Sequence, residues 1–217
     1  MLLDLISLIK KYNLNIRGVY HIGANLGQEL EVYNEIESIK DVLLFEPDPN
    51  IIMELVSKAC SYESRFRKIE TFWLALGPEK KEGIFYVADN EGQSNSLLEP
   101  SYHKIQYPNV LFNDTIIVKV MPLDEIYTHD SFPVDCNFIN MDVQGYELEV
   151  LKGATKTLQH IDYIMCEVNN TELYKGGCLV EHLDEFLQSY NFKRVETSWE
   201  GETWGDALYI KGNNNGI

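Results

Sequence analysis

The stretch that decides the fold is residues 19–30, VYHIGANLGQEL. An apolar run typical of a buried strand leads into a turn of small residues from Gly23 to Gly27, and a helical pattern follows at once. The turn is not the G-x-G-x-x-G of a dinucleotide site, because it reads G-x-N-x-G. Small residues here still let backbone N–H groups approach a ligand at a helix N-terminus. We therefore expect a ligand-binding turn after the first strand of an α/β sheet.

Strand-like and helix-like segments alternate along the rest of the chain. The expected strands are 18–24, 41–47, 71–77, 84–89, 137–143 and 162–168, a strand and short helix at 115–126, and the closing strands FKRVETS and DALYIKG. The expected helices are 28–36, about 50–60, 146–153 and 178–190. This alternation favours a parallel sheet covered on both faces, a three-layer α/β sandwich. The two closing strands have no helix between them, which predicts an antiparallel hairpin at one edge.

Composition limits the possible partners. The 217 residues suit a single domain, 1–217, and the formal charge is 18 − 34 = −16. A surface this negative repels phosphate backbones, so we expect no nucleic acid partner. No run approaches the ~18 apolar residues of a membrane span. We expect no membrane insertion.

Two segments stand outside the alternating pattern. Residues 1–17 have the apolar spacing of an amphipathic helix and lack the basic region and cleavage site of a signal peptide. The cysteines form no C-x-x-C pair, and with that helix they lead us to expect a reduced, cytoplasmic protein. Residues 90–114 form a long polar and aromatic insertion. Such an insertion in a compact domain is usually functional, so we expect a lid over the site.

Ligands of open α/β sheets bind beyond the carboxyl ends of the strands, and acids end three of the predicted strands here. These acids are Glu46, Asp142 and Glu167. A carboxylate at Glu46 can accept both hydrogen bonds of a ribose diol. The first turn lacks the closely spaced glycines that a pyrophosphate requires. Together these features favour S-adenosylmethionine, which has a ribose and no phosphate, over a nicotinamide dinucleotide.

Several segments carry a family resemblance: HIGANLGQ, LFEPDP, ALG, PLDEI, INMDVQGYELEVLKGA and GDALYI. They resemble the FkbM-type S-adenosylmethionine-dependent methyltransferases, which have the class I, Rossmann-like fold. The resemblance runs from about Gly18 to Lys211, and MDVQGYELEVLKGA is its most specific part. It implies a seven-stranded sheet and O-methylation, often of a sugar hydroxyl in a glycan or natural product.

The resemblance also implies where the cofactor binds. The expected cofactor contacts are His21, Gly23, Ala24, Asn25, Gly27, Gln28, Glu46, Pro47, Asp48, Ala75, Ser96 and Asp142. The chain departs from the family at two of its positions. His21 stands where the class usually has an acid, so it either hydrogen-bonds the methionyl end or packs. Asn140 stands where many members have lysine, which weakens any proposal for a catalytic lysine on this strand.

Methyl transfer requires an acceptor oxygen in line with the sulfonium methyl group and a group that takes the hydroxyl proton. The candidate catalytic residues are Asp142, Glu167 and, in the insertion, His103. Asp142 and Glu167 with Asn169 also offer the hard oxygen ligands that suit Mg²⁺. The alternative without metal is that Asp142 orients the donor amine and Glu167 binds the acceptor.

The expected acceptor is a sugar or glycan. Tyr102, Tyr107, Phe112 and Trp204 are the aromatic residues able to stack on a sugar ring. A non-sugar hydroxyl, lipid-linked or polyketide, stays open, and so does a non-catalytic module that only binds S-adenosylmethionine. The chain is also compatible with being part of a larger glycan-modifying polypeptide.

Overall fold

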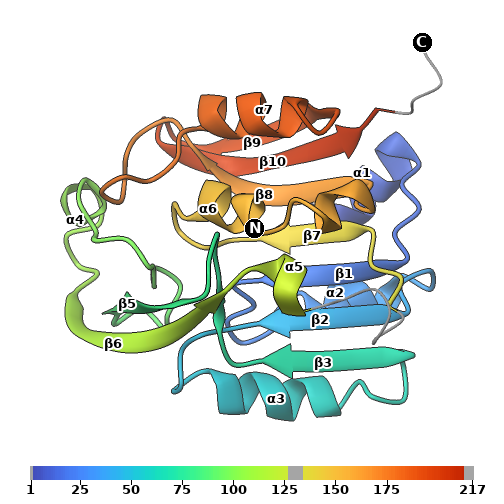
Figure 1. The fold of residues 1–217 in the computed structure, drawn as a ribbon, viewed down its shortest axis with the longest axis horizontal. Coiled ribbons are helices and arrows are strands. Elements are labelled where there is room, and N and C mark those ends of the chain that lie inside the picture. The colour runs from blue at the N-terminus through green and yellow to red at the C-terminus, as the bar shows by residue number, and fades with distance from the viewer. Residues whose placement is uncertain (1, 127–133, 213–217) are drawn as a thin grey trace.

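The computed structural model describes residues 2–126 and 134–212. Its centre is a seven-stranded sheet of order β3-β2-β1-β7-β8-β10-β9 (Figure 1). Neighbours from β3 to β8 pair in parallel, and β10 runs antiparallel to both β8 and β9. The strands are β1 Gly18–Ile22, β2 Asp41–Phe45, β3 Lys68–Phe72, β7 Phe138–Met141, β8 Tyr163–Asn169, β9 Phe192–Glu200 and β10 Trp204–Lys211. The predicted mostly parallel sheet with an antiparallel hairpin at one edge is confirmed.

Helices cover both faces of the sheet. One face packs on α1 Leu5–Tyr12, α2 Leu30–Glu35 and α3 Ile52–Cys60, and the other on α6 Glu147–Lys152 and α7 Val180–Gln188. Alternate residues of the central strands enter the two cores, so Val19 joins the first and Tyr20 the second. Every residue of β1 and β2 is buried as a result. This explains why these strands are continuous apolar runs instead of alternating ones.

A small second sheet follows β3. It has the order β4-β6-β5, with β4 Ala75–Leu76, β5 Lys81–Ala88 and β6 Phe112–Met121, and the short helices α4 His103–Gln106 and α5 Leu123–Ile126 lie beside it in the chain. The expected single strand 71–77 is therefore wrong: its first part ends β3 and its last part is β4. The chain turns at Trp73, where the N–H of Leu74 donates to the carbonyl of Phe72. Most of the expected insertion 90–114 connects β5 to β6, and its last residues belong to β6.

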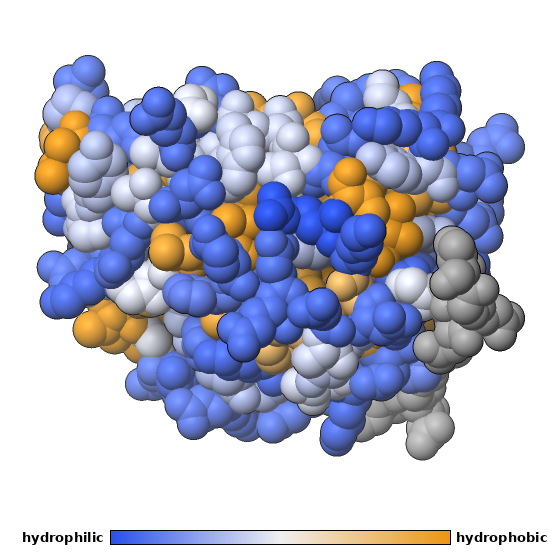
Figure 2. All heavy atoms as spheres, turned by 90° about the horizontal axis from the view of Figure 1, so that it is seen from above, coloured by the Kyte–Doolittle hydropathy of each residue, from blue (hydrophilic) through white to orange (hydrophobic). Residues whose placement is uncertain are grey.

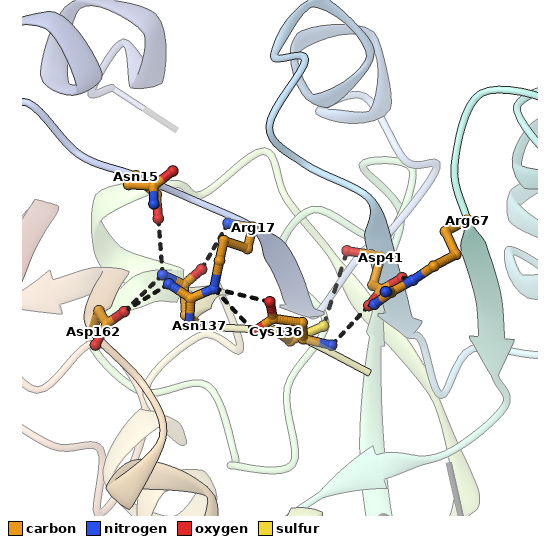
Figure 3. A network of polar contacts seen from close by, with 8 residues as sticks. Asn15, Arg17, Asp41, Arg67, Cys136, Asn137 and Asp162 are labelled. Carbon is orange, nitrogen blue, oxygen red and sulfur yellow. Dashed lines mark hydrogen bonds and ion pairs between the residues drawn. The ribbon is translucent and has the colours of Figure 1, made fainter. Parts of the chain in front are cut away.

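Polar contacts connect the segments at the edge of the sheet where the parallel strands begin (Figure 3). Asp41 at the start of β2 is fully buried and receives the guanidinium of Arg67 and the N–H of Asp135. Arg17 donates from its side chain to Asp135 and from its backbone N–H to the side chain of Asn137. Asp41 is buried while the side chain of Arg67 is 59% exposed, so loss of Arg67 would leave the Asp41 carboxylate buried without its cation. These contacts join the segments that lead into β1, β2, β3 and β7, and the opposite edge is available for the site.

The surface over α7 and the β9–β10 hairpin is largely hydrophilic, with apolar patches between the polar side chains (Figure 2). In residues 2–126 and 134–212, no helix is long and apolar enough to cross a membrane.

Candidate functional site

The first turn lies between the ends of β2 and β7. The N–H groups of Gly23 and Ala24 both donate to the carbonyl of Phe45, and the N–H of Asp142 donates to the carbonyl of Ile22, each at 3.0 Å. Gly23 has φ +78°, and a Cβ there would lie 1.9 Å from the carbonyl oxygen of Asp142. No side chain fits that space. Glycine at this position allows the turn to sit against the end of β7.

Glu46 joins the first turn to the end of β2. Its side chain is 4% exposed, and it accepts the N–H of Asn25 and the N–H of Asp48, each at 2.9 Å. Burial raises the pKa of Glu46 to about 7, and the two backbone hydrogen bonds partly oppose that rise. The carboxylate is held in one position at the carboxyl end of β2. Its remaining lone pairs can accept hydrogen bonds from the two hydroxyls of a vicinal diol, which is the role predicted for Glu46.

Glu46→Ala is expected to weaken binding of S-adenosylhomocysteine by roughly 1–3 kcal/mol, the range for a lost hydrogen bond to a charged acceptor. Isothermal titration calorimetry measures the change, and Glu54→Gln, at an exposed position of α3, is the control. An unchanged dissociation constant in Glu46→Ala would remove Glu46 from the ribose site.

A cavity of about 520 Å³ opens beside this turn, within the usual size range of small-molecule sites. Of the expected cofactor contacts, it is lined by His21, Gly23, Ala24, Asn25, Gln28, Glu46, Pro47, Ala75 and Asp142. Three others lie outside its lining. Gly27 packs near Leu55, Asp48 accepts a hydrogen bond from Asn95, and the hydroxyl of Ser96 donates to the carbonyl of Gln144.

Side-chain hydrogen bonds hold the loop after β5 against the first turn. The side chain of Asn95 is buried; its amide nitrogen donates to Asp48 at 2.8 Å and its oxygen accepts the N–H of Ala88 at 2.7 Å. The side chain of Asn25 donates to the carbonyl of Glu91 at 2.9 Å. These contacts close one side of the cavity with residues of the expected lid.

Three acids meet at the ends of β7 and β8: Asp142, Glu147 and Glu167, each with one oxygen within 4.8 Å of the others'. The side-chain amide of Gln144 lies between two of them, donating to Asp142 Oδ1 and to Glu167 Oε2, both at 2.8 Å. Its oxygen lies 2.9 Å from the hydroxyl of Tyr174. The strand pattern predicted that Asp142 and Glu167 come together; it did not predict the bridging amide.

Burial raises the pKa values of all three acids, and nearby carboxylates add to the rise. The pKa of Asp142 rises to about 6, mainly through burial, although the Gln144 hydrogen bond opposes the rise. Burial raises the pKa of Glu147 to about 7, and burial followed by the charges of Asp142 and Glu147 raises the pKa of Glu167 well above its usual range. Within the described residues, no lysine or arginine lines the cavity beside them. A bound cation would therefore stabilise their ionised forms.

Glu147 differs from its two neighbours in its partners. It is fully buried, and one of its oxygens accepts the N–H groups of Val143 and Gly145, both at 3.1 Å. The thiol of Cys178 lies 3.4 Å from the other oxygen. Glu147 therefore holds the turn between β7 and α6 and is absent from the cavity lining. Its role is to shape the turn that carries Gln144.

The predicted magnesium ligands do not form an open set of oxygens. The amide nitrogen of Asn169 lies 3.1 Å from Glu167, so Asn169 presents a donor to the acid instead of a ligand oxygen. The Gln144 amide occupies the position between Asp142 and Glu167. Mg²⁺ requires near-octahedral oxygen ligands, and here two amide N–H donors already contact the two acids. These residues do not fit a magnesium site in this arrangement.

His103 begins α4 inside a group of aromatic rings. Its side chain is 3% exposed, its Nε2 lies 3.1 Å from the hydroxyl of Ser94, and burial lowers its pKa. Its ring is 5.0 Å from that of Tyr107 and 5.3 Å from that of Tyr174. The indole N–H of Trp204 donates to the hydroxyl of Tyr107 at 2.7 Å. This last contact joins α4 to β10 across the cavity.

The four aromatic residues predicted for sugar stacking have different positions. Tyr107 and Trp204 line the cavity together with His103. Phe112 packs edge-on against the ring of His103, and Tyr102 is exposed to solvent. Only the first two are in place to contact an acceptor in the cavity.

His21 and Asn140 are register partners on β1 and β7. The Asn140 amide donates to the hydroxyl of Tyr33 at 2.6 Å, and the His21 ring meets the Tyr33 ring edge-on. Burial lowers the pKa of His21, and Glu29 lies 3.7 Å from its Nε2. His21 therefore packs against α2 and also borders the cavity, and its hydrogen bond to the methionyl end stays a prediction.

Residues 21–194 match the family model described as the methyltransferase FkbM domain. The 2-O-methyltransferase NoeI of Sinorhizobium fredii (strain NBRC 101917 / NGR234) is 24% identical over 178 residues, covering 79% of this chain and 71% of the relative. The hexuronic acid methyltransferase AglP of Haloferax volcanii is 34% identical over 55 residues, covering 25% of this chain and 23% of the relative.

Solved structures share the fold. The FkbM methyltransferase of Methylobacillus flagellatus KT has a TM-score of 0.60 at 17% identity; the match covers 90% of this chain and 43% of that one. The magnesium protoporphyrin IX methyltransferase of Synechocystis PCC 6803, solved with bound SAM, has a TM-score of 0.51 at 7% identity, over 95% of this chain and 76% of that one. The chain thus spans less than half the length of the first of these structures.

Proposed function

The chain belongs to the FkbM family of S-adenosylmethionine-dependent methyltransferases, and from that premise we propose that it methylates a hydroxyl group of a sugar in a glycan. The observation that carries the proposal is the cavity itself. It is lined both by the first turn with Glu46 and by Glu167, Tyr107 and Trp204. The names of the two curated relatives, a 2-O-methyltransferase and a hexuronic acid methyltransferase, support a sugar oxygen as acceptor.

We place the donor along the carboxyl ends of β1, β2 and β7. Glu46 accepts the ribose hydroxyls, and the small residues from Gly23 to Asn25 leave room for the methionyl end. Asp142 then faces the positively charged part of the donor. A cation beside Asp142 favours its ionised form and opposes the rise in its pKa caused by burial. S-adenosylmethionine supplies the electrophilic methyl group when bound.

We propose that Glu167 is the base that takes the proton of the acceptor hydroxyl. Its carboxyl group lies on β8, the strand next to the one that carries Asp142, and the same Gln144 amide contacts both acids. A raised pKa makes a carboxylate a stronger base toward a hydroxyl. Gln144 and Asn169 hold the carboxylate in position by donating to its two oxygens. In the step itself, the acceptor oxygen bonds to the methyl carbon, the carbon–sulfur bond breaks and the proton passes to Glu167.

His103 is the second candidate for this role. Its pKa is lowered by burial, so its ring is neutral near pH 7 and able to accept a proton. Its Nε2 contact with Ser94 and its aromatic neighbours also suit a purely packing role. The pKa of Glu167 is raised and that of His103 is lowered, so the pH–rate profiles of Glu167→Gln and His103→Ala are needed to separate the two candidates.

Magnesium remains a prediction that the residues do not favour. Because the amides of Gln144 and Asn169 contact the two acids, we assign no catalytic step to a metal. Activity is expected to survive incubation with a chelator. Loss of activity that Mg²⁺ or Mn²⁺ restores would reinstate the metal and require Gln144 to move.

The test of the proposed function is incubation of the protein with methyl-labelled donor and a panel of neutral, amino-bearing and acidic sugars, oligosaccharides and non-sugar alcohols. Label in an alkali-stable ether of a sugar is the expected product. Label only in a non-sugar hydroxyl would favour the alternative acceptor class. The panel should include oligosaccharides, because the chain matches only 43% of a longer related structure. A chain that forms part of a larger glycan-modifying polypeptide would act on such acceptors.

A further inference from the structure

Among the described residues, the charged side chains that line the cavity are all acidic. Five acids line it, and within the described residues neither lysine nor arginine does. These acids are Glu29, Glu46, Asp142, Glu167 and Asp206. The arrangement matters for the acceptor because a buried anion needs a cation or several hydrogen-bond donors close to it.

Two of the five acids are on the acceptor side. Glu167 on β8 and Asp206 on β10 are register partners in an antiparallel pair, so their side chains lie on the same face of the sheet. Trp204 is two residues before Asp206 on the same strand and also lines the cavity. Burial raises the pKa of Asp206, although the backbone N–H groups of Leu2 and Leu3 contact its carboxylate.

Lys104 and Lys81 contact neighbouring side chains but do not line the cavity. Lys104 of α4 lies 6.0 Å from the centre of the Phe112 ring, and Phe112 is outside the cavity lining. Lys81 contacts Tyr146 and pairs with Glu79 at 3.3 Å, and it too is outside the lining. An acceptor in the cavity therefore has no positive side chain among the described residues to pair with.

We infer that the acceptor is a neutral or amino-bearing sugar, and that uronic acids, sugar phosphates and nucleotide-linked sugars are rejected. This inference rests on the proposed function and narrows it. An anionic acceptor next to Glu167 and Asp206 would meet either like charge or protonated acids that give it no counter-charge. A neutral sugar can instead donate its hydroxyls to these acids and lay its apolar face on Trp204. An amino group would gain a favourable charge interaction.

The test compares three acceptors that differ at one carbon: a neutral hexose acceptor from the panel, the matching hexuronate and the methyl ester of that hexuronate. At low ionic strength, kcat/KM for the hexuronate is expected to be at least about tenfold below that for the hexose, because like charges across a site are costly. The neutral ester should recover most of the difference. Added salt should reduce the difference in kcat/KM between the two sugars, because salt screens charges that are exposed to solvent.

Replacing Asp206 tests whether the discrimination against the hexuronate arises from the acids beside the acceptor. In Asp206→Asn, the ratio of hexuronate to hexose activity should rise at least about threefold, because one negative charge is removed beside the acceptor. Glu54→Gln removes the same charge from an exposed position on α3 and should leave the ratio unchanged.

The outcomes separate the two proposals. Equal or faster turnover of the hexuronate would overturn this inference and leave sugar methylation standing. A low kcat/KM for the methyl ester as well as for the hexuronate would show that size, not charge, excludes the hexuronate. That result would also overturn this inference. Methylation restricted to non-sugar hydroxyls would overturn the proposed function itself.

Discussion

Gly23→Ala is expected to weaken binding of S-adenosylhomocysteine by at least about a hundredfold, close to 2.7 kcal/mol. The new methyl group would lie 1.9 Å from the carbonyl oxygen of Asp142, which is backbone and cannot rotate away. The turn must therefore move from the end of β7. That movement displaces the backbone beside Asn25, whose N–H fixes Glu46. Calorimetry measures the affinity, and thermal unfolding shows whether the fold survives.

Gly176→Ala is the matched control for this substitution. Gly176 has φ +76°, nearly the same as Gly23, but a Cβ there has nothing within 4 Å. It therefore carries only the left-handed backbone penalty, on the order of 1–2 kcal/mol. Gly23→Ala should lower the free energy of unfolding by at least about 2 kcal/mol more, the cost of forced overpacking. Wild-type affinity in a folded Gly23→Ala protein would contradict the assigned position of the donor.

Glu167→Gln is expected to lower kcat by about 10²–10⁴-fold, the contribution of a positioned general base. The amide keeps the size of the acid and one of its two acceptor oxygens but cannot take the acceptor proton. Donor affinity should change little, because Glu167 is on the acceptor side of Asp142. Asp142→Asn is the comparison, and it should weaken both donor binding and turnover. Full activity in Glu167→Gln would show that another group accepts the proton.

The pH–rate profile gives an independent test of the same assignment. Because the base must be deprotonated and the pKa of Glu167 is raised by burial and by nearby acids, kcat/KM should increase with pH above the usual carboxylate range. A base at His103 would titrate below the ordinary histidine value, because burial lowers its pKa. Loss of the ascending limb in Glu167→Gln supports Glu167. Loss of that limb in His103→Ala would transfer the role to His103.

The sheet could be predicted because its central strands are buried on both faces. Runs such as DVLLF and NFINM are then apolar throughout, and each is followed by an acid at its carboxyl end. That pattern assigned Glu46, Asp142 and Glu167 to one edge of the predicted sheet, and all three line one cavity in the folded chain. The small second sheet was partly missed. TFWLALG reads as one strand, and periodicity alone does not reveal the turn at Trp73.

The parts of the site that were missed depend on backbone conformation and register. Gln144 reaches both acids from a residue with φ +53°, a left-handed conformation that is uncommon for glutamine. Only the adjacent Gly145 hints at such a turn in the sequence. Asp206 lies beside Glu167 because β10 inserts between β8 and β9, and strand order was not deducible from these segments alone. The acid that opens the otherwise apolar run DALYI was the available signal for a buried carboxylate.

The most direct test of the central claim, that this cavity holds S-adenosylmethionine, is a calorimetric titration of the protein with S-adenosylhomocysteine and, separately, with NAD. We expect micromolar binding of S-adenosylhomocysteine, on the order of −8 kcal/mol, and no competition from NAD. The ribose would bind at Glu46, and the first turn has no cradle for a pyrophosphate. Tight binding of NAD without binding of S-adenosylhomocysteine would contradict the account.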